Sequence, residues 1–492
     1  MQKGGIPLKG NPVNSFFTLV QTSEMIGPTT VNVMSMVVPR TVYDFTRRGP
    51  EAGTETGRRE VTAVLNNSML PGIYALGIGW LLGQFGGVNG TIPLNNSEME
   101  FFHKAWQDSK GNLNKYIEIS LTNAKVCRDG KPVSLLAEGV AGKDTTIDTI
   151  KKYFDDVSKV RDKKEIKKRL KAASSRIVKT TGSEQSILLD GTETTATKFV
   201  KGMERMYREV LSKKNSDEIL KKMKSLCKNR TIAGLAIAAS LGVATQYLNR
   251  HLTKLKTGTD AFVGLPDYDK IIANKSFPEE KKKKSGFGLI LAKAVSVATM
   301  GYLLAASLKG TPRPQKAFKL FFTKDGLEEL GKKLQFKGRL PSLDQLKVLA
   351  AVTYTGRILA SADGNELRET DTRDMLGFLN WLVFGGFVTK LLANKYSKEI
   401  MISKTPEQKG SSRWGRIKHT IMHKYLMSEG EIKAICKAKG LPDTEFKKLM
   451  AKRNLWLGAG IAYSTLVLGI AIPVFNKWLT NKIVGTEGNT AS

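Results

Sequence analysis

The sequence has little cysteine and little histidine, with three of the first and four of the second in 492 residues. The cysteines, Cys127, Cys227 and Cys436, are odd in number and far apart, which argues against a secreted disulfide scaffold and favours a reducing compartment. His419 and His423 could share a helix face, but Thr, Ile and Met separate them and the surrounding residues are cationic. We therefore predict no metal site.

Motifs of catalysis are also missing. The chain contains no GxxxxGK[ST], GxSxG, HExxH or CxxC pattern, and GIGWLLG at 77–83 does not match dinucleotide-binding spacing. We predict no catalytic residue, no cofactor and no enzyme activity, although scattered carboxylates of a lipid enzyme would escape such patterns. The first 25 residues lack an apolar run followed by a small-residue cleavage site, so no cleavable signal peptide is expected.

Negative charge is scarce. Asp and Glu number 45 against 78 Lys and Arg, which gives a formal net charge of +33 and a pI near 9.9. Such a surplus favours a negative partner: an anionic membrane surface, nucleic acid or an acidic protein. The basic residues are spread through nearly every loop, without a zinc finger or an RNA-binding aromatic motif, so nucleic acid is the weaker interpretation.

The charge-dense stretch RRGPEAGTETGRRE covers residues 47–60. Its charged residues Arg47, Arg48, Glu51, Glu55, Arg58, Arg59 and Glu60 could form a salt-bridged collar. Because the planar guanidinium group of arginine binds phosphate through paired N–H donors, the sequence also predicts a lipid-headgroup or partner-binding site here. Its residues would be Arg47, Arg48, Arg58 and Arg59. The alternative is a solvated loop whose charges pair weakly.

Five nearly uncharged apolar blocks are present in the sequence, each about as long as a membrane-spanning helix. They are Met69–Val88, Thr231–Leu248, Gly286–Leu308, Met375–Leu392 and Leu455–Phe475. They are apolar on all sides, and small residues recur in them at four-residue spacing, which permits close helix packing or self-association in a membrane. The alternative is the core of a large soluble bundle.

Three polar residues lie inside these blocks: Lys293, Asn380 and Gln84. Charge inside a bilayer is costly, so Lys293 is expected to extend to the interface or to face a polar interior. Asn380 and Gln84 can form hydrogen bonds between helices. These residues are predicted intramembrane polar sites, either structural or part of a transport pathway.

An internal repeat links two of the blocks. NRHLTKLKTGT at 249–259 resembles NKWLTNKIVGT at 476–486, and the match continues upstream from KNRTIAGLAIAAS at 228–240 to KRNLWLGAGIAYS at 452–464. The second copy carries three extra residues, Thr465–Val467. A basic region and a block that starts Met-Leu precede each copy. The pattern predicts a duplicated half, as in many membrane proteins, and the alternative is chance similarity.

The sequence thus predicts a mainly α, polytopic helical membrane protein with duplicated apolar helix units and a basic helical soluble domain. The predicted segments are an N-terminal segment 1–68, an apolar helix 69–88, a basic soluble domain 90–228, repeat copy 229–259, a linker with an apolar helix 260–310, an amphipathic region 311–374, an apolar helix 375–392, a basic helical segment 393–454, repeat copy 455–486 and a tail 487–492. A short strand is expected at 116–122, and capping boxes at Asp162/Glu165 and Ser428/Glu431.

Three functions are compatible with these features. The first is a non-enzymatic membrane scaffold that binds anionic lipid or a partner protein, with its basic loops mainly in the cytoplasm. The second is a transporter or channel-like protein with a site between the repeats, near Lys293 and Asn380. The third is a soluble or peripheral nucleic-acid-binding protein.

Overall fold

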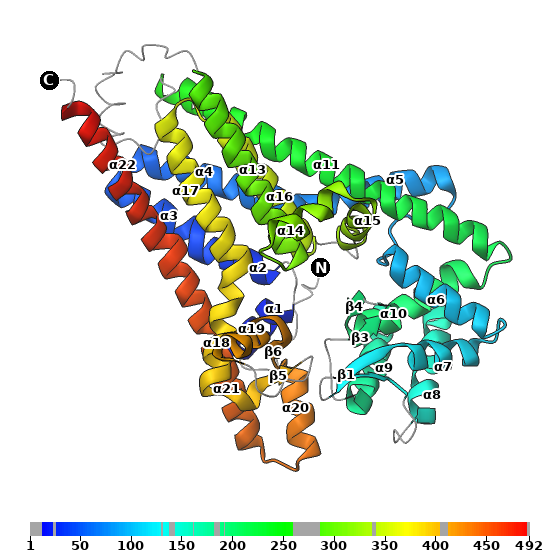
Figure 1. The fold of residues 1–492 in the computed structure, drawn as a ribbon. Coiled ribbons are helices and arrows are strands. Elements are labelled where there is room, and N and C mark those ends of the chain that lie inside the picture. Colours follow the sequence, from blue (N-terminus) through cyan, green and yellow to red (C-terminus); the bar gives the residue numbers. More distant parts are fainter. Residues whose placement is uncertain are drawn as a thin grey trace. The chain divides into compact units, whose positions relative to one another are not determined.

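The computed structural model describes residues 12–22, 26–128, 131–136, 143–160, 162–181, 187–190, 192–258, 286–336, 341–403 and 412–489. Most of the predicted linker before the third apolar block, and the end of the predicted tail, lie outside these ranges. The chain is mainly α-helical, as predicted (Figure 1). It divides into unit 1 (Met1–Thr22, Gly79–Asn229, Phe387–Gly458) and unit 2 (Ser23–Ile78, Arg230–Gly386, Ala459–Ser492).

The central part of unit 1 corresponds to the predicted basic domain. Its elements are α6 (Asn96–Asp108), α7 (Leu113–Asn123), β1 (Lys125–Arg128), β2 (Lys131–Ser134), α8 (Lys143–Lys159), α9 (Lys163–Thr181), β3 (Ile187–Leu189), β4 (Thr192–Thr194), α10 (Ala196–Met206) and the π-helical segment η3 (Tyr207–Leu211). The strands form an antiparallel sheet in the order β2-β1-β3-β4. One core of buried apolar side chains, including Phe102, Tyr116 and Phe199, joins the helices to the sheet.

The strand prediction at 116–122 is wrong, because this stretch lies within helix α7. The Asn112 side chain caps the helix by accepting a hydrogen bond from the Lys115 backbone N–H at 3.1 Å. The buried positions Tyr116, Ile117, Ser120 and Leu121 follow a helical face and not the alternation of a strand. Packing against the domain core therefore outweighs the strand preference of its tyrosine and isoleucines.

The remainder of unit 1 contains α1 (Pro12–Thr22), the second half of α5 (Leu70–Gly86), the start of α11 (Ser216–Thr257), most of α18 (Gly385–Tyr396), η5 (Lys398–Ile400), β5 (Met401–Ser403), α19 (Arg413–His423), β6 (Lys424–Leu426), α20 (Glu429–Ala438) and most of α21 (Asp443–Ser464). The capping box predicted at Ser428 is confirmed. The Ser428 N–H donates to Glu431 Oε2 at 2.7 Å, and the Glu431 N–H donates to Ser428 Oγ at 3.2 Å. Asp162 caps α9 through the Lys164 N–H, at 2.9 Å from Asp162 Oδ1.

Unit 2 is a bundle of helices. Its elements are α2 (Ile26–Asn32), η1 (Val33–Val37), α3 (Val38–Arg47), α4 (Pro50–Val64), η2 (Leu65–Met69), the first half of α5 (Leu70–Gly86), most of α11 (Ser216–Thr257), α13 (Phe287–Lys309), α14 (Pro314–Phe322), α15 (Lys324–Lys333), α16 (Leu343–Ala360), α17 (Gly364–Phe378), η4 (Leu379–Phe384), η6 (Thr465–Ala471) and α22 (Ile472–Asn489). Helix α17 packs on α16 and α22, and α3 packs on α4 (Figure 1).

The described helices of unit 2 are interrupted by π-helical segments, namely η1, η2, η4 and η6. Segment η6 packs on η1 and contacts η4. The second repeat copy is longer by three residues, Thr465–Val467. These residues lie in η6, so the insertion is part of the wider turns of a π-helix. Wide turns of this kind occur frequently at functional sites.

Among the residues that the structure describes, four helical stretches are long and apolar enough to cross a membrane, by length and composition. They are Pro50–Gly86, Ser216–Lys256, Phe287–Lys309 and Asp443–Thr480. The bent pair Gly364–Leu382 and Gly385–Tyr396 would be a fifth. These stretches overlap the five apolar blocks found in the sequence, and only 22–44% of the most apolar window of each of the four is buried.

Candidate functional site

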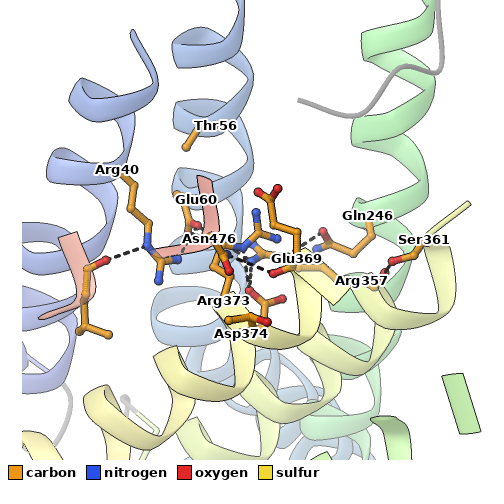
Figure 2. Close-up of polar contacts among 12 residues, drawn as sticks. Arg40, Thr56, Glu60, Gln246, Arg357, Ser361, Glu369, Arg373, Asp374 and Asn476 are labelled. Atoms are coloured by element: carbon orange, nitrogen blue, oxygen red, sulfur yellow. Dashed lines mark hydrogen bonds and ion pairs between the residues drawn. The ribbon is translucent and has the colours of Figure 1, made fainter. Parts of the chain in front are cut away.

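A network of charged and polar side chains is buried in unit 2, in addition to an apolar core that includes Phe378 and Leu468. Figure 2 shows the centre of this network. We call these residues the ionic network. They are Arg40, Asp44 and Arg48 on α3; Glu55, Thr56, Arg59 and Glu60 on α4; Gln246 and Arg250 on α11; Arg357 on α16; Glu366, Glu369, Arg373 and Asp374 on α17; and Asn476 and Thr480 on α22. Their side chains are buried or partly buried.

The hairpin of α3 and α4 places one side of the network. Arg40, Asp44 and Arg48 recur every four residues and therefore lie on one face of α3. Gly49 makes the turn with a φ of 114°, which favours glycine. At Gly53 a Cβ would lie 2.6 Å from the Phe45 Cβ, so only glycine allows the two helices to approach this closely.

The centre of the network is a group of three arginines and two carboxylates. Arg40 Nη1 lies 3.1 Å from Glu60 Oε1, and Arg357 Nη1 lies 4.0 Å from the same oxygen. Asp374 Oδ1 accepts from Arg357 Nη1 at 3.2 Å and from Arg373 Nε at 3.1 Å. Arg40 Nε also donates to the Leu468 carbonyl of η6 at 3.2 Å, which connects the centre to a π-helical segment.

A second group lies towards the α3–α4 turn. Thr56 donates to Asp44 Oδ2 at 2.6 Å, and Arg48 lies 3.5 Å from Asp44 and 3.6 Å from Glu369. Thr480 Oγ1 donates to Glu369 Oε2 at 3.3 Å, and Asn476 Nδ2 donates to the Glu369 carbonyl at 3.2 Å. Helices α3, α4, α17 and α22 are therefore joined by polar contacts and not only by apolar packing.

The two repeat copies contribute equivalent residues. Asn249 and Thr253 in the first copy align with Asn476 and Thr480 in the second, and all four are buried. Arg58 Nη2 donates to the Asn249 carbonyl at 3.0 Å and to Thr253 Oγ1 at 2.7 Å. The Asn–Thr pair of the first copy thus contacts Arg58 of α4, whereas the pair of the second copy contacts Glu369 of α17.

The polar side of α4 continues into η2. Asn66 Nδ2 donates to the Ala238 carbonyl at 2.9 Å, and Thr353 Oγ1 donates to Asn67 Oδ1 at 2.9 Å. Buried polar residues thus extend from Glu55 to Ser68. At 1.5 Å per residue this stretch is about 20 Å long, which is roughly two thirds of the hydrocarbon thickness of a bilayer.

The four predicted arginines occupy different environments. Arg48 lies in the ionic network, Arg59 pairs with Glu55, and Arg58 contacts repeat copy 1. The Arg47 side chain is exposed, and its carbonyl accepts from Lys477 Nζ at 3.2 Å. Three of the four are therefore used in contacts within unit 2, which leaves less of their donor capacity for an external phosphate.

The three predicted intramembrane polar residues have different local environments. Lys293 Nζ donates to the Leu359 carbonyl at 2.9 Å, in the last turn of α16, where a cation is favourable. Asn380 is buried in η4, and its Nδ2 has no hydrogen-bond partner among the described residues. Gln84 is exposed on α5.

Sequence reasoning found one residue at the centre of the network, Glu60, which belongs to the charge-dense stretch at 47–60, and missed the others. A usable signal was present, because Arg40, Asp44 and Arg48 form a polar stripe through a stretch whose other face carries Val42 and Phe45. The partners on α16 and α17 gave no comparable signal, because their charges resemble those of any exposed helix.

Burial also shifts the pKa of two side chains that lie outside the candidate membrane-spanning helices, Tyr354 and Glu204. Burial raises the pKa of the Tyr354 hydroxyl, which keeps it neutral beside Arg357, whose Cζ lies 5.6 Å from the tyrosine ring centre. In unit 1, burial raises the pKa of the Glu204 carboxyl, and the hydrogen bond from Arg208 Nε at 2.8 Å opposes this shift.

Within the described ranges, no three His, Cys, Asp or Glu side chains are grouped so that they could hold a metal ion. The His419 and His423 rings lie 5.2 Å apart on α19. No protein-family model, curated protein or solved structure is detectably similar to this chain.

Proposed function

We propose that this chain is an integral membrane protein of the transporter or channel-like class, which binds a small charged solute in the ionic network of unit 2 and moves it across the membrane. The observation that supports the proposal most is that unit 2 buries a network of charged side chains beside its apolar core, while large apolar side chains of the same helices are exposed. Ionisable residues within membrane helices face the bundle interior and mark solute or proton pathways.

Helices α3 and α22 support this proposal most directly. On α3 the buried Arg40 and Asp44 lie opposite Val42 and Phe45, which are 55% and 51% exposed. On α22 the buried Asn476 lies on the other side from Trp478, which is 54% exposed. In water these helices would leave large apolar surfaces unsatisfied, whereas lipid would cover them.

The energetics of the network also favour a functional role. Burying ion pairs costs several kcal/mol of desolvation per ion, and well-packed apolar residues often stabilise a bundle equally well or better. Transporters with duplicated halves often form their solute sites from interrupted helices at the interface between the halves. In unit 2, π-helical segments interrupt helices near the network. The two repeat copies each contribute a matching Asn–Thr pair.

The second candidate function is the membrane scaffold that binds anionic lipid. A specific observation favours it, because α9 exposes a row of lysines that can lie on an anionic surface. They are Lys163, Lys164, Lys167, Lys168 and Lys171. Replacing Lys163, Lys164 and Lys167 with Gln should then weaken binding to phosphatidylserine vesicles and leave solute flux unchanged.

Membrane insertion and flux test the main proposal. The full chain should stay in the membrane pellet after an alkaline carbonate wash. Proteoliposomes that contain it should dissipate a potassium phosphate or potassium chloride gradient, and Arg357→Gln should lower the rate. Lys332→Gln is the control, because Lys332 pairs with Glu328 at the exposed surface of α15 in the same unit. A chain that is washed off the membrane, or proteoliposomes no leakier than empty vesicles, would refute the proposal.

A further inference from the structure

The carboxylate of Glu60 lies between two arginines in the centre of unit 2. Its Oε1 is 3.1 Å from Arg40 Nη1 and 4.0 Å from Arg357 Nη1, and all three side chains are less than a tenth exposed (Figure 2). Planar guanidinium groups recognise planar or tetrahedral oxyanions through paired N–H donors. Glu60 therefore occupies a position in which the oxyanion of a ligand would be recognised equally well.

Both arginines retain unused donors. Arg40 Nη2 and Arg357 Nη2 are buried and have no hydrogen-bond partner among the described residues. An unpaired buried donor of a charged group is costly. On the side of Arg40 Nη2, Gly377 presents no side chain, and a Cβ at that position would lie 3.5 Å from the nitrogen.

The local charges balance. Three arginines, Arg40, Arg357 and Arg373, and three carboxylates, Glu60, Glu369 and Asp374, interact at the centre, so an entering anion would have to take the place of Glu60. Asp374 contacts Arg357 and Arg373 independently of Glu60. If Glu60 moved aside, Arg357 would keep Asp374 as a partner, while Nη1 of Arg40 would become available and Arg40 Nε would still donate to the Leu468 carbonyl.

We infer that the solute of unit 2 is a small oxyanion, with a carboxylate or phosphate group that replaces Glu60 between Arg40 and Arg357. This inference rests on the proposed function, because it names the class of solute for the same site. Glu60 acts as an internal competitor that holds the two arginines until the ligand displaces it.

The first test is binding of inorganic phosphate and of acetate to the purified full chain in detergent, measured by isothermal titration calorimetry. Glu60→Gln keeps the size of the side chain but removes the competing charge, so it should tighten oxyanion binding by about tenfold or more. Arg40→Lys and Arg357→Lys keep the charge but lose the fork, so each should weaken binding by about tenfold. Lys332→Gln should bind like the unaltered chain.

A lipid headgroup could supply the same phosphate chemistry. The titration should therefore be repeated with dioctanoyl-phosphatidylglycerol at concentrations below its micelle threshold. Competition with inorganic phosphate that is lost in Arg40→Lys supports the oxyanion site and assigns its ligand to lipid. Binding of phosphate and acetate that the lipid does not compete with supports the same site with a free solute as its ligand.

Three outcomes overturn the inference. They are unchanged or weaker oxyanion binding in Glu60→Gln, equal binding in Arg40→Lys and Lys332→Gln, and proteoliposomes that pass potassium but bind and pass no oxyanion. The last outcome leaves the proposed transport function standing. Oxyanion binding with the expected response to all variants, but without flux, supports the inference and overturns transport.

Discussion

The pair of Arg40 and Glu60 is the sharpest test of how unit 2 is held together. Replacing only Arg40 with Met leaves the Glu60 carboxylate buried with a single, more distant arginine at 4.0 Å. Replacing only Glu60 with Leu leaves Arg40 with the Leu468 carbonyl as its remaining hydrogen-bond acceptor within the described residues. Removing one partner of a buried pair typically costs about 3–5 kcal/mol, which is a large part of a typical total stability of about 5–15 kcal/mol.

The double variant should behave differently from the sum of the two single variants. If the two effects were independent, the double variant would lose about 6–10 kcal/mol, twice the cost of breaking one buried pair. We expect it to lose less than either single variant, because Met and Leu fill the space without leaving a buried charge, while Asp374 still neutralises Arg357. The coupling free energy should therefore be several kcal/mol, well above the usual error of about 0.3–0.5 kcal/mol for independent sites.

The assay is denaturant unfolding of the four proteins in the same detergent, followed by circular dichroism, with the free energy of unfolding obtained by linear extrapolation. Additive losses would refute the reasoning, because they would mean that the two side chains do not depend on each other. Single variants as stable as the unaltered chain would mean that water reaches this position and solvates the remaining charge.

Three further predictions concern other parts of the chain. Because burial raises the folded-state pKa of Glu204, this carboxyl favours the fold below its unfolded pKa, and that contribution is lost as the pH rises through the folded pKa. Glu204→Gln should therefore raise the thermal midpoint at pH 7 and have little effect in acid; equal gains at both pH values would contradict this. Gly234→Leu should destabilise unit 2 by about 1–3 kcal/mol, since even a Cβ there would lie 3.1 Å from the Ala75 Cβ, whereas Gly301→Ala, which faces open space, should be neutral or slightly stabilising in the same denaturant assay. Ser428→Ala should cost about 0.5–2 kcal/mol by loss of its cap, and a Ser428→Asp variant that fails to retain stability would argue against capping as the cause.

Several features of the fold follow from local sequence and are predictable for that reason. The helical character of the apolar blocks depends on about 20 successive apolar residues, and the cap at Ser428 depends on a residue three positions away. The strand expected at 116–122 shows the limit of local reasoning. Its residues have the composition of a strand, but contacts with the domain core make the helix more favourable.

The candidate site lies mostly beyond local prediction. The sequence drew attention to the arginines at 47–59, and Arg48 and Arg59 do belong to the ionic network. The partners of its central residues come from distant parts of the chain: Arg357 lies almost 300 residues after Glu60, and Leu468 lies 428 residues after Arg40. No periodicity within one helix can indicate such a pairing.

By itself, the sequence determined the helical class, the positions of the long apolar helices and the similarity of the two repeat copies, because each depends on residues close together in the chain or on direct comparison of segments. Only the tertiary structure decided that a charged network is buried in unit 2 beside an apolar core, while other apolar side chains such as Phe45 and Trp478 are exposed. The physical reason is that a helix with one charged and one apolar face can pack either way round. The choice depends on whether several helices supply opposite charges to the same interior, as α3, α4, α16 and α17 do here.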